Sequence, residues 1–395
     1  MINITRKEDC CGCGACFDAC SKNAIVWEPD HEGFSYPRVD TSKCVKCGLC
    51  NKVCPIENSD TINNRNKVNT PIVLGAYHKD NDIRFSSTSG GAFWGLAENF
   101  VKNGGYVAGA VFYDHFKIKH IVTNDLNELQ KIKGSKYAQS DCRGIYRQIA
   151  TLLKSGEKVM ATGLPCQMAA LRQYLRKDYD KLLVVDLICH SVTSQLPFQM
   201  YIDYLERKYN SKVVSFHPKY KGAGGWHKFA FKAQFANGAT YMEHAGEDYY
   251  CMLSYGTSIM SRHSCFECHY KHCPQPSDIT IGDFWGIEKI DENYDSPQGI
   301  SKIVINTPLG QKYIDQLPEL SVKEFDAQIS IYENPHSWSM IRPLKRCDMS
   351  LREEFVNSLH SRGFEYSIKK FLQRKPSLTH RILSKIKRYV TKSHK

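Results

Sequence analysis

The sequence predicts two folds in one chain: a small, cysteine-dense α+β domain, then an α/β body with a mixed sheet and a C-terminal helical tail. Nine of the 17 cysteines lie before residue 55. A length of 395 residues, 42% hydrophobic and 24% charged, indicates a globular chain too long for one ordinary core. From residue 72 onward, short apolar runs alternate with helical periodicity, which is typical of α/β layering.

Residues 1–56 repeat one cysteine spacing, C-x2-C-x2-C-x3-C. In two-cluster bacterial ferredoxins this spacing gives three ligands to one 4Fe-4S cluster and the fourth to the other. We therefore predict a two-cluster ferredoxin domain here, followed by a polar linker over residues 57–71. Structural zinc is the alternative, but zinc sites use other ligand spacings. The predicted ligands are Cys10, Cys13, Cys16 and Cys54 for cluster one, and Cys20, Cys44, Cys47 and Cys50 for cluster two.

The body, residues 72–365, is expected to alternate strands and helices. Asn237-Gly238 between two alternating runs predicts a hairpin turn. The expected strands span residues 72–77, 106–112, 158–161, 182–188, 229–236, 239–243 and 303–305. The expected helices span residues 89–102, 146–154, 166–175 and 198–208.

The net charge of +12 is concentrated in the tail, residues 366–395, which has ten basic residues and no acidic one. The nearly neutral remainder argues against nucleic-acid binding. Leu378, Ile382, Ile386 and Tyr389 share one face of a predicted basic helix. That helix would either lie on an anionic membrane surface or pack on the body. Without an apolar leader or a spanning segment, and with many cysteines, we expect a cytoplasmic protein, peripheral at the inner membrane surface in the first case.

Six further stretches of the sequence form a recognisable set. They are His-Glu-Gly-Phe-Ser-Tyr-Pro at 31–37, Ser-Thr-Ser-Gly-Gly at 87–91, Gly-Ser-Lys-Tyr at 134–137, Gly-Leu-Pro-Cys-Gln at 163–167, Cys-Phe-Glu-Cys at 265–268 and the run at 277–286. Together they resemble one family, the coenzyme F420 hydrogenase/dehydrogenase beta-subunit proteins. The similarity covers roughly residues 1–345 and implies an iron–sulfur flavoprotein oxidoreductase with FAD. The sequence departs from the family pattern at Ser21, where a proline is common, and after Cys189, where Gly and Pro are missing.

The resemblance implies a third 4Fe-4S cluster in the body, held by Cys166, Cys189, Cys265 and Cys268. The alternatives are separate buried thiols, or a zinc knuckle of Cys273 with His269 and His272. We interpret Cys11 and Cys273 as spare thiols, and Cys142, Cys251 and Cys347 as structural.

The resemblance also implies the flavin site. Hydroxyls and glycines before a helix suit a phosphate, although alone they more often form a cap. His190 and Lys136 are the candidate catalytic residues; a structural histidine and a surface lysine are the alternatives. The candidate FAD contacts are Ser87, Ser89, Gly90, Gly91, Lys136, Gly163 and Asp283.

The leading expectation is an oxidoreductase that passes electrons from 4Fe-4S clusters through FAD to a small-molecule substrate. Its partners would include an electron donor such as a ferredoxin or a reduced deazaflavin. Family association alone points to surface-polysaccharide metabolism. The alternative is an electron-transfer adaptor that docks on a partner enzyme and has no substrate of its own.

Overall fold

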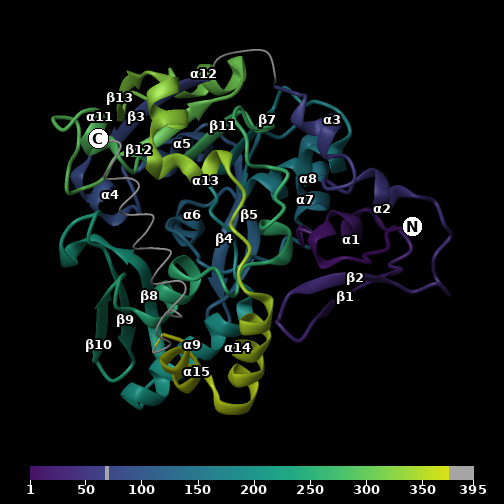
Figure 1. Cartoon of the computed structure of the whole chain (residues 1–395). Helices are drawn as coiled ribbons and strands as arrows, with labels where there is room; N and C mark the ends of the chain where they lie inside the picture. Colours follow the sequence, from purple (N-terminus) through teal and green to yellow (C-terminus); the bar gives the residue numbers. More distant parts are fainter. Residues whose placement is uncertain (67–70, 373–395) are drawn as a thin grey trace, which may run out of the picture. The chain divides into compact units, whose positions relative to one another are not determined.

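The computed structural model describes residues 1–66 and 71–372. Residues 1–347 form one compact unit, and a second unit begins at Asp348. The first unit contains both the cysteine-dense segment and the α/β body (Figure 1). The expected α+β start and the α/β body with a mixed sheet are therefore confirmed.

The cysteine-dense segment is built from one hairpin and short helices. The strands β1 (Ile25–Pro29) and β2 (Ser35–Val39) pair antiparallel. The helices α1 (Ala15–Ala19) and α2 (Leu49–Lys52) each begin after a glycine in the left-handed region, Gly14 and Gly48. The repeated cysteine spacing thus yields a repeated local structure, a tight loop that turns into a short helix.

An eight-stranded mixed sheet forms the body. Its centre is parallel, since β4, β6, β7 and β11 pair in that sense, and the remaining pairs are antiparallel. In spatial order the strands are β13 (Leu320–Phe325), β3 (Ile72–His78), β12 (Ser301–Ile305), β11 (Ile279–Asp283), β7 (Leu182–Leu187), β6 (Val159–Gly163), β4 (Tyr106–Tyr113) and β5 (Lys117–Thr123).

Helices cover both faces of this sheet, as the continuous apolar runs of its central strands require. In β7, Leu183 and Val185 join the core on one face, and Leu182 and Val184 join the core on the other. The first core includes α5 (Ala92–Lys102), α6 (Leu126–Ile132) and α12 (Pro308–Ile314). The second includes α7 (Ile145–Lys154) and α8 (Pro165–Leu175).

The predicted hairpin is present as β9 (Ala230–Phe235) and β10 (Thr240–His244). It gains a third strand, β8 (Val213–Tyr220), which follows α9 (Gln195–Tyr209). Neither β8 nor β5 was expected from the sequence. The remaining short elements are η1 (Lys7–Asp9), α4 (Asn81–Ser86), η2 (Lys221–Ala223), α10 (Tyr249–Cys251), η3 (Met252–Gly256), η4 (His263–Cys265), α11 (Ile287–Ile290), η5 (Gln328–Glu333), η6 (Pro335–Ser337) and α13 (Trp338–Ile341).

The cysteine-dense segment is docked on the body rather than tethered to it. Asp18 of α1 accepts hydrogen bonds from the backbone N–H groups of Gly144, Tyr146 and Arg147 at the start of α7. The segment expected to be a linker contains α3 (Ser59–Asn63), whose Ile62 packs with Ala169 and Tyr270. The domain boundaries proposed from the sequence therefore cross extensive packing.

The second unit contains α14 (Met349–Arg362) and α15 (Phe364–Leu372), which pack together through Phe355 and Phe371. Leu378, Ile382, Ile386 and Tyr389 of the predicted tail helix lie outside the described residues. Within residues 1–66 and 71–372, no helix has the length and apolar character needed to cross a bilayer.

Candidate functional site: three cysteine pockets and a cavity

The predicted ligands of cluster one line a single pocket. Cys10, Cys13 and Cys16 come from the first loop, and Cys54 comes from the end of the second. All four are at most 8% exposed. At Gly12, which has a φ of +70°, an added Cβ would lie 2.6 Å from a guanidinium nitrogen of Arg262. Only glycine fits this approach, so the loop and the body are matched in shape here.

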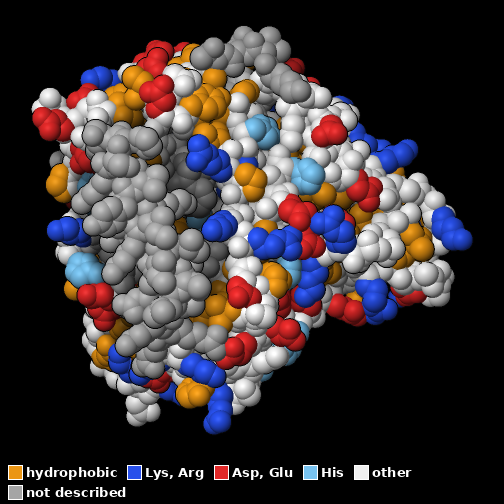
Figure 2. Space-filling model, in the orientation of Figure 1, with side chains coloured by type: hydrophobic (Ala, Val, Ile, Leu, Met, Phe, Trp, Pro, Cys, Tyr) orange, Lys and Arg blue, Asp and Glu red, His pale blue; other side chains and the backbone are white. Residues whose placement is uncertain are grey.

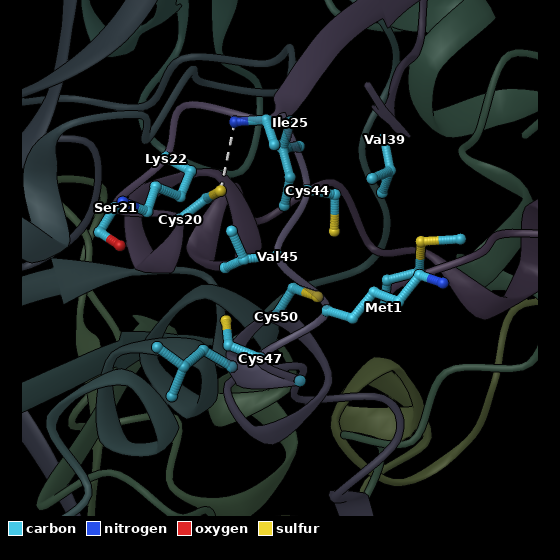
Figure 3. Close-up of a pocket in the computed structure, with 14 residues that line it drawn as sticks. Met1, Cys20, Ser21, Lys22, Ile25, Val39, Cys44, Val45, Cys47 and Cys50 are labelled. Carbon is cyan, nitrogen blue, oxygen red and sulfur yellow. Dashed lines mark hydrogen bonds between the residues drawn. The ribbon is translucent and has the colours of Figure 1, made fainter. Parts of the chain in front are cut away.

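The predicted ligands of cluster two line another pocket, shown in Figure 3. The sulfur atoms of Cys20, Cys44, Cys47 and Cys50 surround one space in this view. Backbone N–H groups donate to two of these sulfurs, from Ile2 to Cys50 at 3.1 Å and from Ala24 to Cys20 at 3.3 Å. Cys47 is exposed. This set therefore includes an exposed cysteine, whereas the four cysteines of cluster one are all buried.

The four body cysteines also meet at one pocket, which Cys166, Cys189, Cys265 and Cys268 line. Cys166 lies in the first turn of α8, where Gln167 holds the turn by accepting the Leu164 N–H at 2.9 Å. Cys189 follows β7, and Cys265 ends η4. Cys273 does not line this pocket and packs instead in the core around Phe284.

The spacing of the sulfur atoms bears on the zinc alternative. Zinc–sulfur bonds of about 2.3 Å bring the sulfurs of a tetrahedral site to about 3.8 Å from one another. Among the described residues, no three cysteine sulfurs lie within 4.8 Å of one another, and neither do the ligand atoms of His269, His272 and Cys273. The described residues therefore contain no preassembled zinc site at these cysteines.

Cys11 lies between the two inner pockets and lines both. Side-chain hydrogen bonds join its thiol to those of Cys13 and Cys166. The pocket of cluster one and the body pocket thus adjoin at Cys11, and Ile56 also lines both. Cys11 is 6% exposed, as expected for a spare buried thiol, but it lines two pockets at once.

Two cations, Arg262 and Lys271, contact these cysteines, and no sequence pattern selects either of them. Arg262 is buried and donates to the Cys10 carbonyl at 2.7 Å, to Ser35 O at 3.0 Å and toward Cys10 Sγ at 3.5 Å. Lys271 donates to the carbonyls of Cys189 and His190. Burial raises the pKa of Cys189 to about 11 and that of Cys265 to about 12, so each thiol keeps its proton until a bound metal displaces it.

A cavity of about 280 Å³ adjoins the body pocket, whereas each cysteine pocket has only 20–30 Å³ of free space. The cavity lies at the carboxyl ends of the parallel strands, where ligands bind in open α/β sheets. Its walls mix apolar side chains such as Phe93 and Ile132 with hydroxyl groups. The cavity and the body pocket share five lining residues: Leu164, Cys189, His190, Ser191 and Val192.

Most of the predicted flavin residues lie around this cavity. Ser87, Ser89 and Gly91 form one wall before α5. Because Gly91 is the N-cap of α5 and has no side chain, it does not cap the first amides of that helix. Gly90 does not line the cavity; an added Cβ there would lie 2.2 Å from Ala76 O, so its role is close packing.

The other candidates have clear local partners. Lys136 lines the cavity, but its ammonium donates to four carbonyls at the end of α6, those of residues 131–134, at 2.8–3.0 Å. Burial lowers its pKa to about 7. Asp283 forms an ion pair with the buried Lys219. His190 and Gly163 also line the cavity.

Lys133 is a further cavity residue that sequence reasoning missed. Its ammonium donates to Ser86 Oγ at 2.6 Å, next to the Ser87–Gly91 loop. It lies three residues before Lys136 in the Gly-Ser-Lys-Tyr region, and the sequence contains nothing that separates these two lysines. Only the fold shows that Lys133 faces the loop while Lys136 caps α6.

Comparison with known protein families finds two matching regions in the chain. Residues 9–58 match the 4Fe-4S dicluster domain, and residues 156–328 match the C terminus of the coenzyme F420 hydrogenase/dehydrogenase beta subunit. A stretch of 52 residues, 13% of this chain, is 38% identical to an uncharacterized ferredoxin of Methanocaldococcus jannaschii, of which it covers 66%.

A solved structure is similar over most of the chain. It is a chain of the xenon-derivatised F420-reducing [NiFe] hydrogenase complex from Methanosarcina barkeri, with 19% identity and a TM-score of 0.45. The match covers 77% of this chain and 91% of that one. The chain is therefore similar to a 4Fe-4S dicluster domain near its start and, later in the chain, to the C terminus of the coenzyme F420 hydrogenase/dehydrogenase beta subunit.

Proposed function

We propose that this protein is an iron–sulfur flavoprotein oxidoreductase that delivers electrons, one at a time, to FAD and then to a small-molecule substrate. One observation carries the proposal: three cysteine pockets and a cavity adjoin one another in a single order. The outer pocket and the cluster-one pocket flank one small core that contains Cys16, Cys20, Cys50 and Cys54. Cys11 joins the second pocket to the third, and Cys189 joins the third to the cavity.

The proposed third cluster is held by Cys166, Cys189, Cys265 and Cys268. Support comes from the convergence of the four on one pocket. Four thiolates are the ligand set of a 4Fe-4S cube. Lys271 would offset part of the negative charge of such a site, because its ammonium is held against the backbone of Cys189.

FAD is the cofactor that we assign to the cavity. The N-terminus of α5, beside Ser87 and Ser89, would receive the pyrophosphate, since helix N-termini favour anions. The two serine hydroxyls donate to the carbonyls of Ile83 and Ile300, so they would border the phosphate rather than donate to it. Lys133 would add a cation there. The apolar side chains of the cavity wall, among them Phe93 and Ile132, suit the flavin ring system. Iron–sulfur clusters exchange single electrons, and a flavin can combine two of them for hydride chemistry.

The protein side chains then position the reactants and exclude water. His190 lies between the body pocket and the cavity and is the proposed acid–base group for the substrate. Lys136 stabilises the loop at residues 133–137 through its four carbonyl contacts, and we propose it as a positioning residue for the flavin. The family resemblance favours a substrate from surface-polysaccharide metabolism, and the free state of all 17 cysteines favours a reducing compartment.

Anaerobic purification with iron, sulfide and flavin counted per chain tests the cofactors. We expect about twelve irons, from three cubes, and about one FAD. Cys265→Ala should lower the iron content by about four and prevent reduction of the flavin by the N-terminal clusters. Retention of all the iron would reject the third cluster, and absence of flavin would reject the oxidoreductase. If the flavin is bound but no small molecule reoxidises it without a partner protein, the adaptor alternative holds.

A further inference from the structure

The outer cysteine pocket opens on a face with an unusual composition. Val45 is 62% exposed and Cys47 is exposed, so apolar atoms surround the opening. Lys22 and Lys46 line the same pocket (Figure 3). Among the described residues that line it, none is Asp or Glu. Figure 2 shows Lys and Arg side chains together with hydrophobic atoms at this outer end of the cysteine-dense segment.

More lysines extend this face along the chain. Lys43 and Lys52 are exposed and flank the cysteines of the second run. Lys43 pairs with Asp40 at 3.2 Å. In the part of the chain that the structure describes, Lys22, Lys46 and Lys52 form no ion pair with a carboxylate. Their charge is therefore available to a partner. Lys22 and Lys46 border an apolar centre, as in a typical interface with a polar rim, and Lys52 ends α2, whose Leu49 and Cys50 line the same pocket.

Exposure distinguishes this face from the other cysteine sites. The cluster-one cysteines are buried, and the four cysteines of the body pocket are only partly exposed. Only at the outer set does an exposed ligand, Cys47, bring the site to the surface. If electrons enter from another protein, this face offers the shortest approach.

We propose that the Lys22–Lys46–Lys52 face is the docking surface for an acidic one-electron carrier protein, such as an acidic ferredoxin or flavodoxin. The reduced carrier gives up one electron to the cysteine-bound site and leaves oxidised. The inference rests on the proposed function, because it names the partner that supplies the same electron path. Charge complementarity across this face would steer the encounter and make it sensitive to salt.

The test uses the intact holoprotein and the triple variant Lys22→Glu/Lys46→Glu/Lys52→Glu. A matched control reverses the same charge at Lys228, Lys289 and Lys312, exposed lysines of the body. Binding of an oxidised acidic ferredoxin is measured directly, and its reduced form is then mixed with each protein over a series of salt concentrations. We expect about tenfold weaker binding and slower reduction for the first triple variant at low salt, and little change for the control.

Photoreduced deazariboflavin, a neutral small reductant, separates the possible failures. It should reduce the first triple variant as fast as the wild type, with the iron content unchanged. Equal ferredoxin binding by both triple variants would overturn the docking surface while leaving the electron path intact. Failure of the small reductant to reduce wild-type flavin would instead overturn the proposed function. A substitution of the same lysines by Gln replaces the Glu variant if iron is lost, and binding that is indifferent to salt would also reject the proposal.

Discussion

At the scale of single residues, Cys11 raises the sharpest question of ligand identity. It is adjacent to Cys10 and hydrogen-bonded to both Cys13 and Cys166, yet the two neighbouring pockets each already have four cysteines. We therefore expect Cys11→Ala to retain all the iron, whereas Cys13→Ala loses about four irons. Iron and sulfide analysis of both variants is the measurement, and loss of a cube from Cys11→Ala would make it a ligand.

Arg262 is a buried cation of the body that contacts Cys10, a predicted ligand of cluster one. Its buried guanidinium lies 3.5 Å from Cys10 Sγ and is also held by Gln139 at 3.0 Å. A positive charge close to a site stabilises the reduced, more negative form. Arg262→Gln should therefore lower the reduction potential of the N-terminal site by on the order of 100 mV, the size of a few kcal/mol for one electron.

Arg262→Lys is the matched control, because it retains the charge while losing the planar contacts. A redox titration followed by electron paramagnetic resonance measures both variants. If Arg262 acts through its charge, Arg262→Lys should keep most of the wild-type reduction potential of the N-terminal site. Equal shifts in the two variants would mean that Arg262 acts through packing and not through its charge.

At the scale of elements, the sequence predicted the regular parts of the fold well. The cysteine repeat, the buried run at residues 182–188 and the Asn237-Gly238 turn each specify a local structure, and each element is present. The strands β5, β8, β11 and β13 were not predicted. In β8, Pro218 interrupts the pattern, and β5 and β8 are identified only by their pairing with β4 and β9.

In the candidate site, as in the fold, some features could be predicted from the sequence and others could not. Cysteine positions follow from spacing and resemblance, whereas Arg262 and Lys133 could not be selected from the sequence. Arg262 is 252 residues from Cys10, and nothing local to its position indicates that contact. Gly90 was selected as a cofactor contact from the family resemblance of residues 87–91, but a side chain there would meet Ala76 O of β3 and Ser301 N of β12.

The docking of α1 on α7 gives a prediction at this scale. The Asp18 carboxylate accepts three backbone N–H groups at the start of α7, which a glycine N-cap leaves without its own side-chain partner. Asp18→Ala should cost about 1–2 kcal/mol of unfolding free energy, the range of a lost helix cap. Denaturation measures the loss, and hydrogen exchange should rise at residues 144–147.

Asp125→Ala is the matched control, since Asp125 caps α6 by accepting from Asn127 N and Glu128 N within the body. This control should raise hydrogen exchange at α6 and leave α7 protected. If Asp18→Ala leaves the exchange of α7 unchanged, the carboxylate does not cap that helix in solution.

At the scale of the whole molecule, the order of the pockets predicts where electrons accumulate when one site is missing. Along a single path, loss of the outer site blocks all later sites, and loss of the third site blocks only the cavity. Cys47→Ala should therefore bind flavin normally, yet a reduced carrier protein should reduce neither its remaining clusters nor its flavin at the wild-type rate. In Cys265→Ala the same carrier should reduce the N-terminal clusters fully while the flavin stays oxidised. Stopped-flow spectra that follow iron–sulfur bleaching and flavin absorbance separately can distinguish these patterns.

A branched arrangement, in which the body pocket receives electrons independently, would give rapid flavin reduction in Cys47→Ala. That outcome would contradict the linear order that Cys11 and Cys189 establish between adjoining pockets.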